Sequence, residues 1–362
     1  MQPSSQPIVQ VVQHLAPGGL EVMALELARA QARRHPVIVV SLEGDADSAC
    51  AAWPRLAREA TPLIFMGKRP GLDAALPLRL ARLFRQVGAV GVHTHHIGPL
   101  LYAGLAARTI RNLRCVHTEH DAWHLQNAKR RRLARLALRL AAPVLTADAP
   151  HVADAVQAAL GGARPRVVLN GVDTARFASG DRAAARRALG LPADGPVVGI
   201  AARLEPVKGV DIALRALALL PGVRLAVAGS GSERDNLRAL AAELGVCARI
   251  RWLGHLDDTA LLYQAADVVC LPSRAEGLPL AALEAQACGR RVVASRVGGV
   301  PTALDPASGT LVEAENPEAL ARGLRLALGD PDSGEPRDFV ARTASLDAME
   351  AAYSNLMLGD VP

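Results

Sequence analysis

The sequence is poor in aromatic residues, in paired cysteines and in long apolar runs. Aromatic residues make up only 3% of its 362 positions, and no basic segment is interleaved with them, which argues against a surface where nucleic-acid bases stack. The five cysteines are odd in number and form no CxxC pair, so we expect free thiols in a reducing compartment. No apolar run reaches the about 18 residues of a spanning helix, and the first residues lack the features of a signal peptide. We therefore expect a cytoplasmic protein without a membrane-spanning helix.

The composition is that of a globular protein with room for two domains. Hydrophobic residues account for 50% of the chain, which is enough to fill a core in each of two domains of ordinary size. Lysine and arginine number 41 against 35 aspartates and glutamates, a net charge of +6. This surplus favours anionic partners such as nucleotides, phosphates or acidic lipid, but it is too small to indicate nucleic acid.

Short β-branched runs alternate with Ala-, Leu- and Arg-rich stretches of helical period, the pattern of parallel sheets covered by helices on both faces. Strands are expected at 8–15, 37–42, 62–66, 89–95, 114–120, 143–147 and 166–170, and again at 196–203, 223–229, 250–254, 268–273, 291–296 and 309–313. Residues 170–181 are rich in Gly, Asp and Ser and lack apolar period, so we expect them to connect two Rossmann-like α/β domains that face each other across a cleft. A last helical pattern covers 339–357.

The stretch PSRAEGLPLAALEAQACG (272–289) places two glutamates at the end of a buried strand, where open α/β sheets bind ligands. Pro279 suits the first turn of a helix that Gly289 closes, so Glu276 lies in the loop and Glu284 about one turn into the helix. A helical path would separate the two carboxylates by roughly 12 Å, more than the ~5–9.5 Å of a glycosidase acid and base. A loop can shorten this distance, so the spacing argues against a hydrolytic pair without excluding it.

A second interpretation gives each part of this motif its own task. Backbone amides of Gly277, Leu278 and Leu280 can bind phosphate oxygens at the helix N-terminus, and a carboxylate can accept hydrogen bonds from two adjacent sugar hydroxyls. The alternative is that both glutamates are solvated and bind no ligand.

Cations and glycines follow other expected strands. Arg203 ends a strand and Lys208 opens the next helix, an arrangement that can hold a diphosphate through a planar guanidinium and a point charge. Two surface cations are the alternative. Gly18 and Gly19 join the first strand to its helix, where glycine lets the backbone approach a ligand closely. This turn is not GxGxxG, and no acidic residue follows it in a way that indicates NAD.

Histidines close two expected strands of the first half: His93, His95, His96, His117, His120 and His124. Such density can bind zinc, although no HExxH motif is present and hydrogen-bonded core histidines are the simpler interpretation.

Residues 127–140 form a basic amphipathic pattern in which Leu133, Leu136 and Leu140 share one face. This pattern is compatible with contact to an anionic membrane surface. It is equally compatible with a solvated helix that packs on its leucines.

Taken together, these motifs resemble the retaining glycosyltransferases of the GT-B fold, family 4, also called group 1. The resemblance covers nearly the whole chain and is most specific in the second half. The motifs there are LNGVDTARF (169–177), AARLEPVKG (201–209), VAGSGSERDNLRALAAELG (227–245) and ADVVCLPSRAEGLPLAALEAQACGRRVVASRVGG (266–299), and the two glutamates of the last one form the family's E-x7-E pattern. The first half contributes GGLE (18–21) and HTEHD (117–121).

The resemblance implies a role for each candidate residue. Arg203 and Lys208 are similar to the pair that holds the donor diphosphate, Glu276 to the residue at the hydroxyls of the transferred sugar, and Glu284 to the ribose ligand. His120 matches the family's active-site histidine and completes the expected catalytic set of His120, Arg203, Lys208 and Glu276. The other donor contacts are expected at Gly18, Gly19, Gly229, Gly277, Leu278, Pro279 and Leu280. Leu278 stands where many relatives carry an aromatic residue, a difference that bears on the sugar pocket.

The resemblance also implies domains and substrates. Residues 1–170 would bind the acceptor, 171–335 would bind the nucleotide sugar, and 336–362 would carry the last helix back to the first domain. The family uses a nucleoside-diphosphate sugar as substrate, with no tightly bound metal and no cofactor. We therefore expect a metal-independent retaining hexosyltransferase with a glycan or lipid-linked acceptor, active in bacterial-type polysaccharide or envelope glycan synthesis, and peripheral to the inner face of the plasma membrane if 127–140 binds lipid. No nucleic acid is expected as a partner.

Other functions stay open at this point. The same fold serves nucleotide-sugar epimerases and phosphorylases, and the histidines allow a metal-dependent hydrolase. A sensor that binds the donor without turnover is a further alternative.

Overall fold

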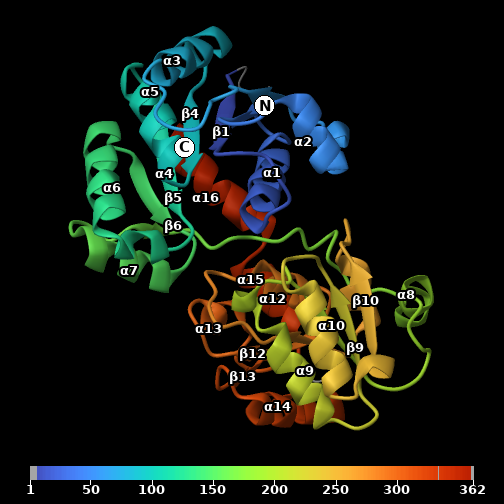
Figure 1. Cartoon of the computed structure of the whole chain (residues 1–362). Coiled ribbons are helices and arrows are strands. Elements are labelled where there is room, and N and C mark those ends of the chain that lie inside the picture. The colour runs from blue at the N-terminus through green and yellow to red at the C-terminus, as the bar shows by residue number, and fades with distance from the viewer. Residues whose placement is uncertain (1–5, 333, 360–362) are drawn as a thin grey trace. The chain divides into compact units, whose positions relative to one another are not determined.

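The computed structural model describes residues 6–332 and 334–359, which form two compact units. The first unit comprises Met1–Gly171 and Leu346–Pro362, and the second comprises Val172–Ser345. In Figure 1 each unit contains its own sheet with helices packed around it. Because each unit also has its own hydrophobic core, each meets the usual definition of a domain.

The first unit is built on a 7-stranded parallel sheet in the order β3-β2-β1-β4-β5-β6-β7. Its strands are β1 (Ile8–Val12), β2 (Val37–Ser41), β3 (Leu63–Phe65), β4 (Gly91–His95), β5 (Arg114–Glu119), β6 (Val144–Ala147) and β7 (Arg166–Val167). The central strands β1 and β4 are buried along their whole length, as expected for parallel strands covered on both faces. The order reverses between β1 and β4, the point where such sheets bind ligands beyond the carboxyl ends of their strands.

Helices cover both faces of this sheet. They are α1 (Gly19–Gln31), α2 (Ala46–Ala52), α3 (Leu76–Val87), α4 (Ile97–Pro99), α5 (Leu105–Arg108), α6 (Ala128–Ala141), α7 (Pro150–Leu160) and α16 (Leu346–Leu358), with the turns η1 (Pro54–Arg58), η2 (Leu100–Gly104) and η3 (Trp123–Gln126). Successive residues of β2 face opposite sides, since Val39 packs in a cluster with α1 and Val40 in a cluster with α3. The last helix, α16, packs on α1, β4 and β5.

The second unit repeats this plan on a 6-stranded parallel sheet in the order β10-β9-β8-β11-β12-β13. Its strands are β8 (Val197–Ala201), β9 (Arg224–Ala228), β10 (Ile250–Gly254), β11 (Val268–Leu271), β12 (Arg291–Ser295) and β13 (Thr310–Val312). Its helices are α8 (Arg182–Leu189), α9 (Val210–Ala218), α10 (Arg234–Glu243), α11 (Ala260–Ala265), α12 (Leu280–Ala287), α13 (Val300–Ala303), α14 (Pro317–Gly329) and α15 (Pro336–Thr343), with the turns η4 (Pro206–Lys208) and η5 (Cys247–Arg249).

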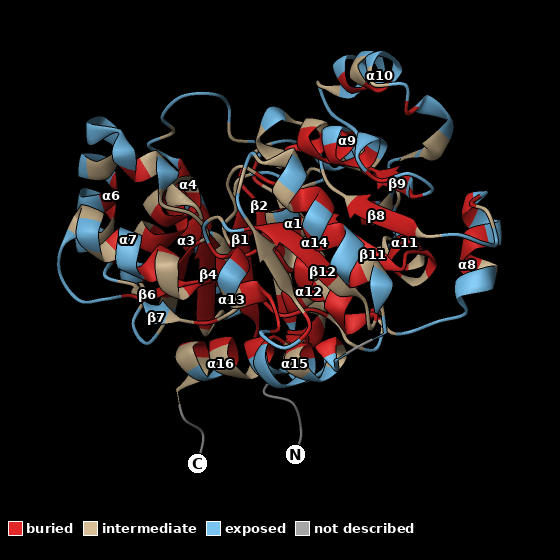
Figure 2. Cartoon of the chain, turned by 90° about the horizontal axis from the view of Figure 1, so that it is seen from below, coloured by how far each residue is buried: buried red, intermediate tan, exposed pale blue. Residues whose placement is uncertain are grey.

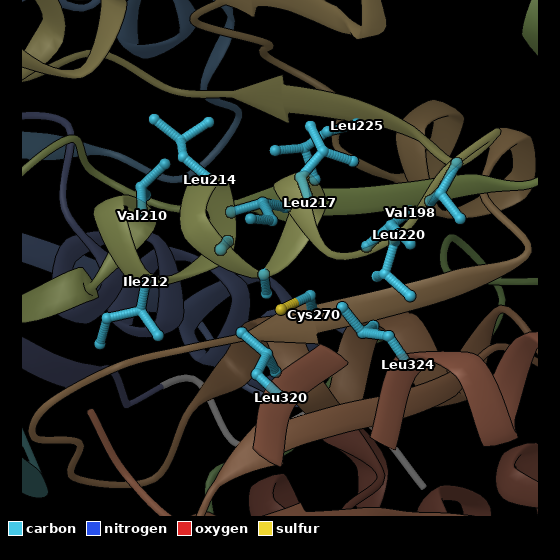
Figure 3. Close-up of a cluster of buried hydrophobic side chains, with 14 of the residues drawn as sticks. Val198, Val210, Ile212, Leu214, Leu217, Leu220, Leu225, Cys270, Leu320 and Leu324 are labelled. Atoms are coloured by element: carbon cyan, nitrogen blue, oxygen red, sulfur yellow. The ribbon is translucent and has the colours of Figure 1, made fainter. Parts of the chain in front are cut away.

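The core of the second unit lies on both sides of its sheet. On one side Val198, Leu225 and Cys270 from neighbouring strands lie together with Leu217 of α9 and Leu324 of α14 (Figure 3). On the other side the alternate strand residues pack against α8 and α11. Figure 2 shows the same division by burial, with strands such as β8 and β11 buried and the outer faces of α8 and α10 exposed. Among the described residues, no helix has the length and apolarity needed to cross a bilayer.

The predicted fold class, two Rossmann-like α/β domains with the last helix in the first one, is confirmed. Every strand in the described residues lies within an expected range. The single helix expected at 339–357 is wrong, because α15 and α16 are separate helices. Ala344 ends α15 with φ −144° and accepts a backbone hydrogen bond from Val172 at 3.0 Å, so its carbonyl is not used in a helix. The segment that rejoins the first unit therefore starts at Leu346, later than the expected residue 336.

Candidate functional site

The carboxyl ends of β8, β9 and β11 bring predicted donor residues to one edge of the second sheet. Arg203 follows β8, Gly229 follows β9, and Glu276 lies in the loop between β11 and α12. Their loops are adjacent because the strands are neighbours in the order β9-β8-β11. Arg203 is exposed, and its guanidinium has no hydrogen-bond or ion-pair partner among the described residues. This edge can therefore present a cation to a ligand.

Lys208 and Glu276 contact each other directly. Lys208 Nζ donates to both carboxylate oxygens of Glu276, at 2.7 Å to Oε1 and 2.9 Å to Oε2. Ser273 Oγ donates to Oε1 of the same carboxylate at 2.7 Å. The carboxylate is thus held from two sides, and the ammonium charge offsets its own. Lys208 and Glu276, for which separate roles were predicted, therefore form one hydrogen-bonded group.

Glu284 is oriented by two hydroxyls from the segment before β11. Tyr263 Oη donates to Glu284 Oε2 at 2.8 Å, and Thr259 Oγ1 donates to the same atom at 3.3 Å. Burial, together with the nearby Glu284 charge, raises the pKa of Tyr263 well above its ordinary value, so the phenol stays protonated and donates. These hydrogen bonds keep the Glu284 carboxylate in one orientation, as is required of a side chain that binds two adjacent hydroxyls of a ligand.

The start of α12 offers unpaired amides. The sequence predicts Pro279 in the first turn of this helix. In the structure Pro279 is instead the residue that caps the helix. The amides of Gly277, Leu278 and Leu280 donate no backbone hydrogen bond in the part of the chain that the structure describes. Amides at the start of a helix carry partial positive charge. The side chain of Leu278 is buried, so a ligand contact at this position would use its backbone.

Two glycines allow the loops of this edge to pack closely. Gly298, with φ +46°, follows β12, and a Cβ there would lie 1.9 Å from the carbonyl oxygen of Glu276. Gly229, with φ +141°, would place a Cβ 1.8 Å from the carbonyl oxygen of Ala202. Side chains avoid both these conformations and these distances. Gly229 therefore keeps the loops after β8 and β9 together, and Gly298, which was not among the predicted residues, supports the Glu276 loop.

His120 lies at the carboxyl end of β5 in the first sheet, and both sides of its ring are held. Its Nδ1 is 3.3 Å from Asp148 Oδ2, and its Nε2 is 3.1 Å from Nδ1 of His95. Asp148 in turn accepts a hydrogen bond from Asn170 Nδ2 at 3.0 Å. Because a carboxylate accepts, the Nδ1 proton of His120 points at Asp148. The predicted active-site histidine therefore has a fixed ring orientation at the ligand-binding edge of its own sheet.

Two buried acceptors beside His120 have no partner. Oδ1 of Asp148 and Oδ1 of Asn170 form no hydrogen bond within the described chain. A buried polar atom without a partner costs about 1–3 kcal/mol, so a water or a hydroxyl of a ligand at this edge would be stabilising. Neither residue was predicted for the site. The only sequence signals were that Asp148 follows a strand and that Asn170 begins the segment between the domains.

The histidines considered for zinc form a hydrogen-bonded core instead. His95, His117 and His120 each use both ring nitrogens in hydrogen bonds. Burial lowers the pKa of His93 and His95 well below 6.5 and that of His96 to about 4, so these rings are neutral at pH 7. Within residues 6–332 and 334–359, no three His, Cys, Asp or Glu side chains are grouped so that they could hold a metal ion.

Gly18 and Gly19 begin α1 beyond the carboxyl end of β1. Gly18 caps the helix in an extended conformation, and a Cβ added to Gly19 would meet no atom within 4 Å. Packing inside the first unit therefore does not require glycine at position 19. Glycine there leaves the backbone open to close approach, and the predicted ligand contact at Gly18 and Gly19 stays a prediction.

The basic helix α6 packs on alanines. Ala137 and Ala141 pack against Leu100 of η2, whereas Leu133, Leu136 and Leu140 are 40%, 52% and 50% exposed. The interpretation of α6 as a helix packed on its leucines is therefore wrong. The small side chains let α6 approach η2 closely: a Cβ added to Gly104 of η2 would lie 2.8 Å from the Cβ of Ala141 in α6. The leucines of α6 therefore lie on its exposed face.

The hydroxyl partners of the two glutamates were missed by the sequence analysis. Ser273 stands three residues before Glu276, a spacing that could have indicated a hydrogen bond within the loop. Tyr263 comes from the helix before the strand, and no spacing rule connects it to Glu284.

Known proteins resemble this chain along both units. Residues 181–344 match the family model described as glycosyl transferases group 1, and residues 17–176 match the one described as glycosyltransferase family 4. D-inositol 3-phosphate glycosyltransferases of Mycobacterium leprae and Mycobacterium tuberculosis are 46% identical over 201 residues and 49% identical over 207 residues. These alignments cover 51% and 53% of this chain and 47% and 42% of the relatives, so they span less than half the length of the relatives.

Solved structures agree in fold. HepE of Anabaena, solved in complex with UDP, superposes with a TM-score of 0.83 at 22% identity over 98% of this chain and 100% of that chain. Sucrose-phosphate synthase of Thermosynechococcus elongatus gives a TM-score of 0.80 at 23% identity over 97% of this chain and 98% of that chain. The two family models together cover most of both units. The chain belongs to the group 1, or family 4, glycosyltransferases of the GT-B fold.

Proposed function

We propose that this glycosyltransferase moves a hexose from a nucleoside-diphosphate sugar to a glycan or lipid-linked acceptor, with retention of anomeric configuration and without a metal ion. The observation that carries the proposal is the group formed by Lys208, Glu276 and Ser273 beside the unpaired amides that open α12. This group combines a cation and amides, which suit phosphate oxygens, with a carboxylate that suits sugar hydroxyls.

The reaction needs stabilisation of negative charge more than it needs an acid and a base. A nucleoside diphosphate is a good leaving group, and charge builds on its β-phosphate as the bond to the sugar breaks. Lys208, Arg203 and the amides of α12 would stabilise that charge from fixed positions. Glu284, held by Tyr263, would bind the ribose, and Glu276 would bind the sugar. His120, whose ring is oriented by Asp148, keeps the role that its likeness to the family's active-site histidine implies.

The names of similar proteins indicate which substrates to try first. HepE was also solved in complex with UDP-glucose, and the mycobacterial relatives are named for inositol 3-phosphate. We therefore place UDP-glucose first among UDP-, GDP- and ADP-sugars as donors, and inositol 3-phosphate beside lipid-linked glycans among acceptors. The proposed setting is the synthesis of a bacterial-type polysaccharide or envelope glycan.

Product analysis tests the proposed reaction. The protein is incubated with donor and acceptor, with and without EDTA, and the anomeric configuration of the product is read by NMR. We expect a new glycoside with the donor's configuration, formed at the same rate in EDTA. An epimerised donor would favour the epimerase, and a sugar phosphate would favour the phosphorylase. Activity that EDTA removes and zinc restores would favour a hydrolase that uses the histidines.

We also propose that α6 contacts an anionic membrane surface from the cytoplasmic side. The helix contains six basic residues and no acidic one: Lys129, Arg130, Arg131, Arg132, Arg135 and Arg139. Its three exposed leucines form an apolar stripe, and Trp123 of the preceding turn η3 is 52% exposed. Apolar side chains between cations suit the boundary between lipid headgroups and acyl chains.

A further inference from the structure

A large cavity opens at the amino end of the first sheet. Its volume is about 980 Å³, at the upper end of the range of small-molecule sites. It is lined by the turn between α5 and β5, the end of α6, the starts of β6 and β7, and the end of α16. Arg114 begins β5 and His120 follows the same strand, so the cavity lies roughly 20 Å along the strand from that histidine. It is therefore not part of the candidate site.

Among the residues that the structure describes, the cavity is lined by four arginines and by no acidic side chain. Arg108 ends α5, Arg111 lies in the following turn, Arg114 begins β5, and Arg166 begins β7. Their guanidinium groups form no hydrogen bond or ion pair with any residue that the structure describes. Apolar side chains such as Ile110 also line the cavity. The arrangement concentrates positive charge around one space.

The chain backbone also adapts to this cavity. Gly359 has φ +81°, and a Cβ there would lie 2.7 Å from the Arg114 guanidinium. Asn112, in the turn that bears Arg111, has φ +63°, a conformation that asparagine tolerates better than most residues. These two positions let the turn and the end of α16 come close to the arginines.

A structural role for these arginines would be to complement helix ends. The carboxyl ends of α5, α6 and α16 border the cavity, and cations near helix carboxyl ends are stabilising. Such a role normally includes hydrogen bonds to the last carbonyls, as Arg135 makes to Leu160 at 3.1 Å. The four cavity arginines make none within the described chain, so their donors are free to bind another acceptor.

We propose that this cavity binds a phosphorylated ligand that carries several negative charges. A guanidinium offers two parallel donors that match the oxygens of a phosphate, and it remains charged at every physiological pH. Four such groups around one space repel one another when the cavity is empty and are neutralised by a polyanion. The phosphate groups could belong to a soluble molecule or to the headgroup of an anionic lipid, since the chemistry is the same.

Calorimetric titration with sodium tripolyphosphate tests the proposal. Wild-type protein should bind it, and the double variant Arg111→Gln with Arg166→Gln should bind at least about tenfold more weakly. The matched control is Arg58→Gln with Arg82→Gln, which removes the same charge from exposed positions of the same unit outside the cavity. Equal weakening in both double variants, or no binding by the wild type, would overturn the proposal.

Two further titrations keep the result interpretable. Arg111→Lys with Arg166→Lys retains the charge but loses the paired donors, so binding weaker than that of the wild type while the fold is intact supports the site. The edge with Lys208 is also expected to bind phosphates, so the titration is repeated with Lys208→Ala. Binding that disappears in Lys208→Ala but survives in Arg111→Gln with Arg166→Gln would place tripolyphosphate at the donor edge and overturn the proposal.

Vesicles separate the two sources of phosphate. Phosphatidylcholine vesicles with and without phosphatidic acid are sedimented with the wild type and with Arg111→Gln/Arg166→Gln, in which α6 is unchanged. Capture that requires both phosphatidic acid and the two arginines assigns the site to a lipid headgroup. Tripolyphosphate binding with equal vesicle capture of the two proteins assigns it to a soluble phosphorylated ligand.

Discussion

In the proposed function, Lys208 joins the carboxylate that would bind the sugar to the diphosphate of the donor. In the structure its ammonium is shared by both oxygens of Glu276, whose carboxylate also accepts from Ser273. A diphosphate at this edge would meet a lysine already fixed in place, so little side-chain freedom would be lost on binding. Glu276 would gain sugar hydroxyls as donors, and the lysine, kept in place beside it, would contact the phosphate.

Substitution of the pair should separate these contributions. Lys208→Ala should lower kcat/KM for transfer by about two to three orders of magnitude, because a charge-stabilising donor is lost. Glu276→Gln keeps an acceptor for Ser273 and removes the charge, so a loss of at least about tenfold is expected. Steady-state kinetics with a saturating acceptor measure both. Arg238→Ala, which removes an exposed cation of α10, serves as control, and full turnover by Lys208→Ala would show that the assignment is wrong.

The candidate residues of the site could be predicted from sequence only where each partner belongs to a recognisable motif. Glu276 and Lys208 occur in two recognisable motifs, and their association follows from the adjacency of β8 and β11. Tyr263 and Asp148 could not be predicted, because each reaches its partner from a different segment by packing. Side-chain packing of this kind depends on the complete fold and leaves no local period in the sequence.

At the scale of elements, the loop after β11 depends on its neighbour after β12. Gly298 lies against the backbone of Glu276 so closely that no side chain fits between them. The position of the carboxylate is thus set partly by a glycine 22 residues further along the chain. Activity should therefore respond to this glycine although it presents no functional group.

Gly298→Ala should reduce transfer activity by at least about tenfold, because the new methyl group must displace the Glu276 loop. Gly254→Ala is the matched control. Gly254 has φ +68°, and nothing lies within 4 Å of an added Cβ, so it shares the backbone strain of about 1 kcal/mol without the collision. Thermal unfolding and kinetics of both variants check this expectation. Equal activity of the two variants would contradict the role of Gly298.

The two faces of α6 explain why the packed face of this helix was predicted wrongly from the sequence. Leucines and alanines both recur at helical spacing, and hydropathy favours the leucines as the packed face. The structure buries the alanines instead because η2 comes too close for larger side chains. Elements and their order were predictable from periodicity, whereas the face that packs depends on the neighbouring backbone.

Replacement of the leucines tests the membrane contact of α6. Leu133→Gln with Leu136→Gln and Leu140→Gln should weaken binding to anionic vesicles by at least about tenfold. The free energy of unfolding of this triple variant should change by no more than about 0.5 kcal/mol for each substitution, since these are surface positions. Leu219→Gln with Leu326→Gln, at exposed positions of the second unit, should bind like the wild type. Vesicle co-sedimentation at low salt measures the binding of each protein. Unchanged binding of the triple variant would show that the leucines do not insert into the membrane.

At the scale of the whole molecule, the two units differ in their histidines. Only His255 belongs to the second unit, whereas the other nine of the ten lie in the first. Burial lowers the pKa of His93, His95 and His96. The unfolded chain therefore binds more protons than the folded one below about pH 6.5, and stability falls as the pH decreases through that range. His124, whose pKa is raised by its hydrogen bond to Asp121, acts in the opposite direction.

Acidification should therefore weaken the first unit selectively. From pH 7.5 to 5.5 the three histidines together would cost up to about 4 kcal/mol of the free energy of unfolding, and His124 would offset part of this loss. Hydrogen exchange of β4 and β5, corrected for intrinsic rates, should accelerate relative to that of β8 and β11. An equal response of both sheets would show that the buried histidines do not govern acid stability.

We propose above all that the second unit binds a nucleotide sugar through Lys208, Glu276 and the start of α12. The most direct measurement is a thermal-shift and calorimetric screen of nucleoside diphosphates and their sugars against the wild type and Lys208→Ala. A ligand that binds only the folded state raises the melting temperature, and the increase grows with the logarithm of the ligand concentration above its Kd. We predict that at least one nucleotide sugar stabilises the wild type and loses most of this effect in Lys208→Ala. Stabilisation by none of them, or equal stabilisation of both proteins, would contradict the claim.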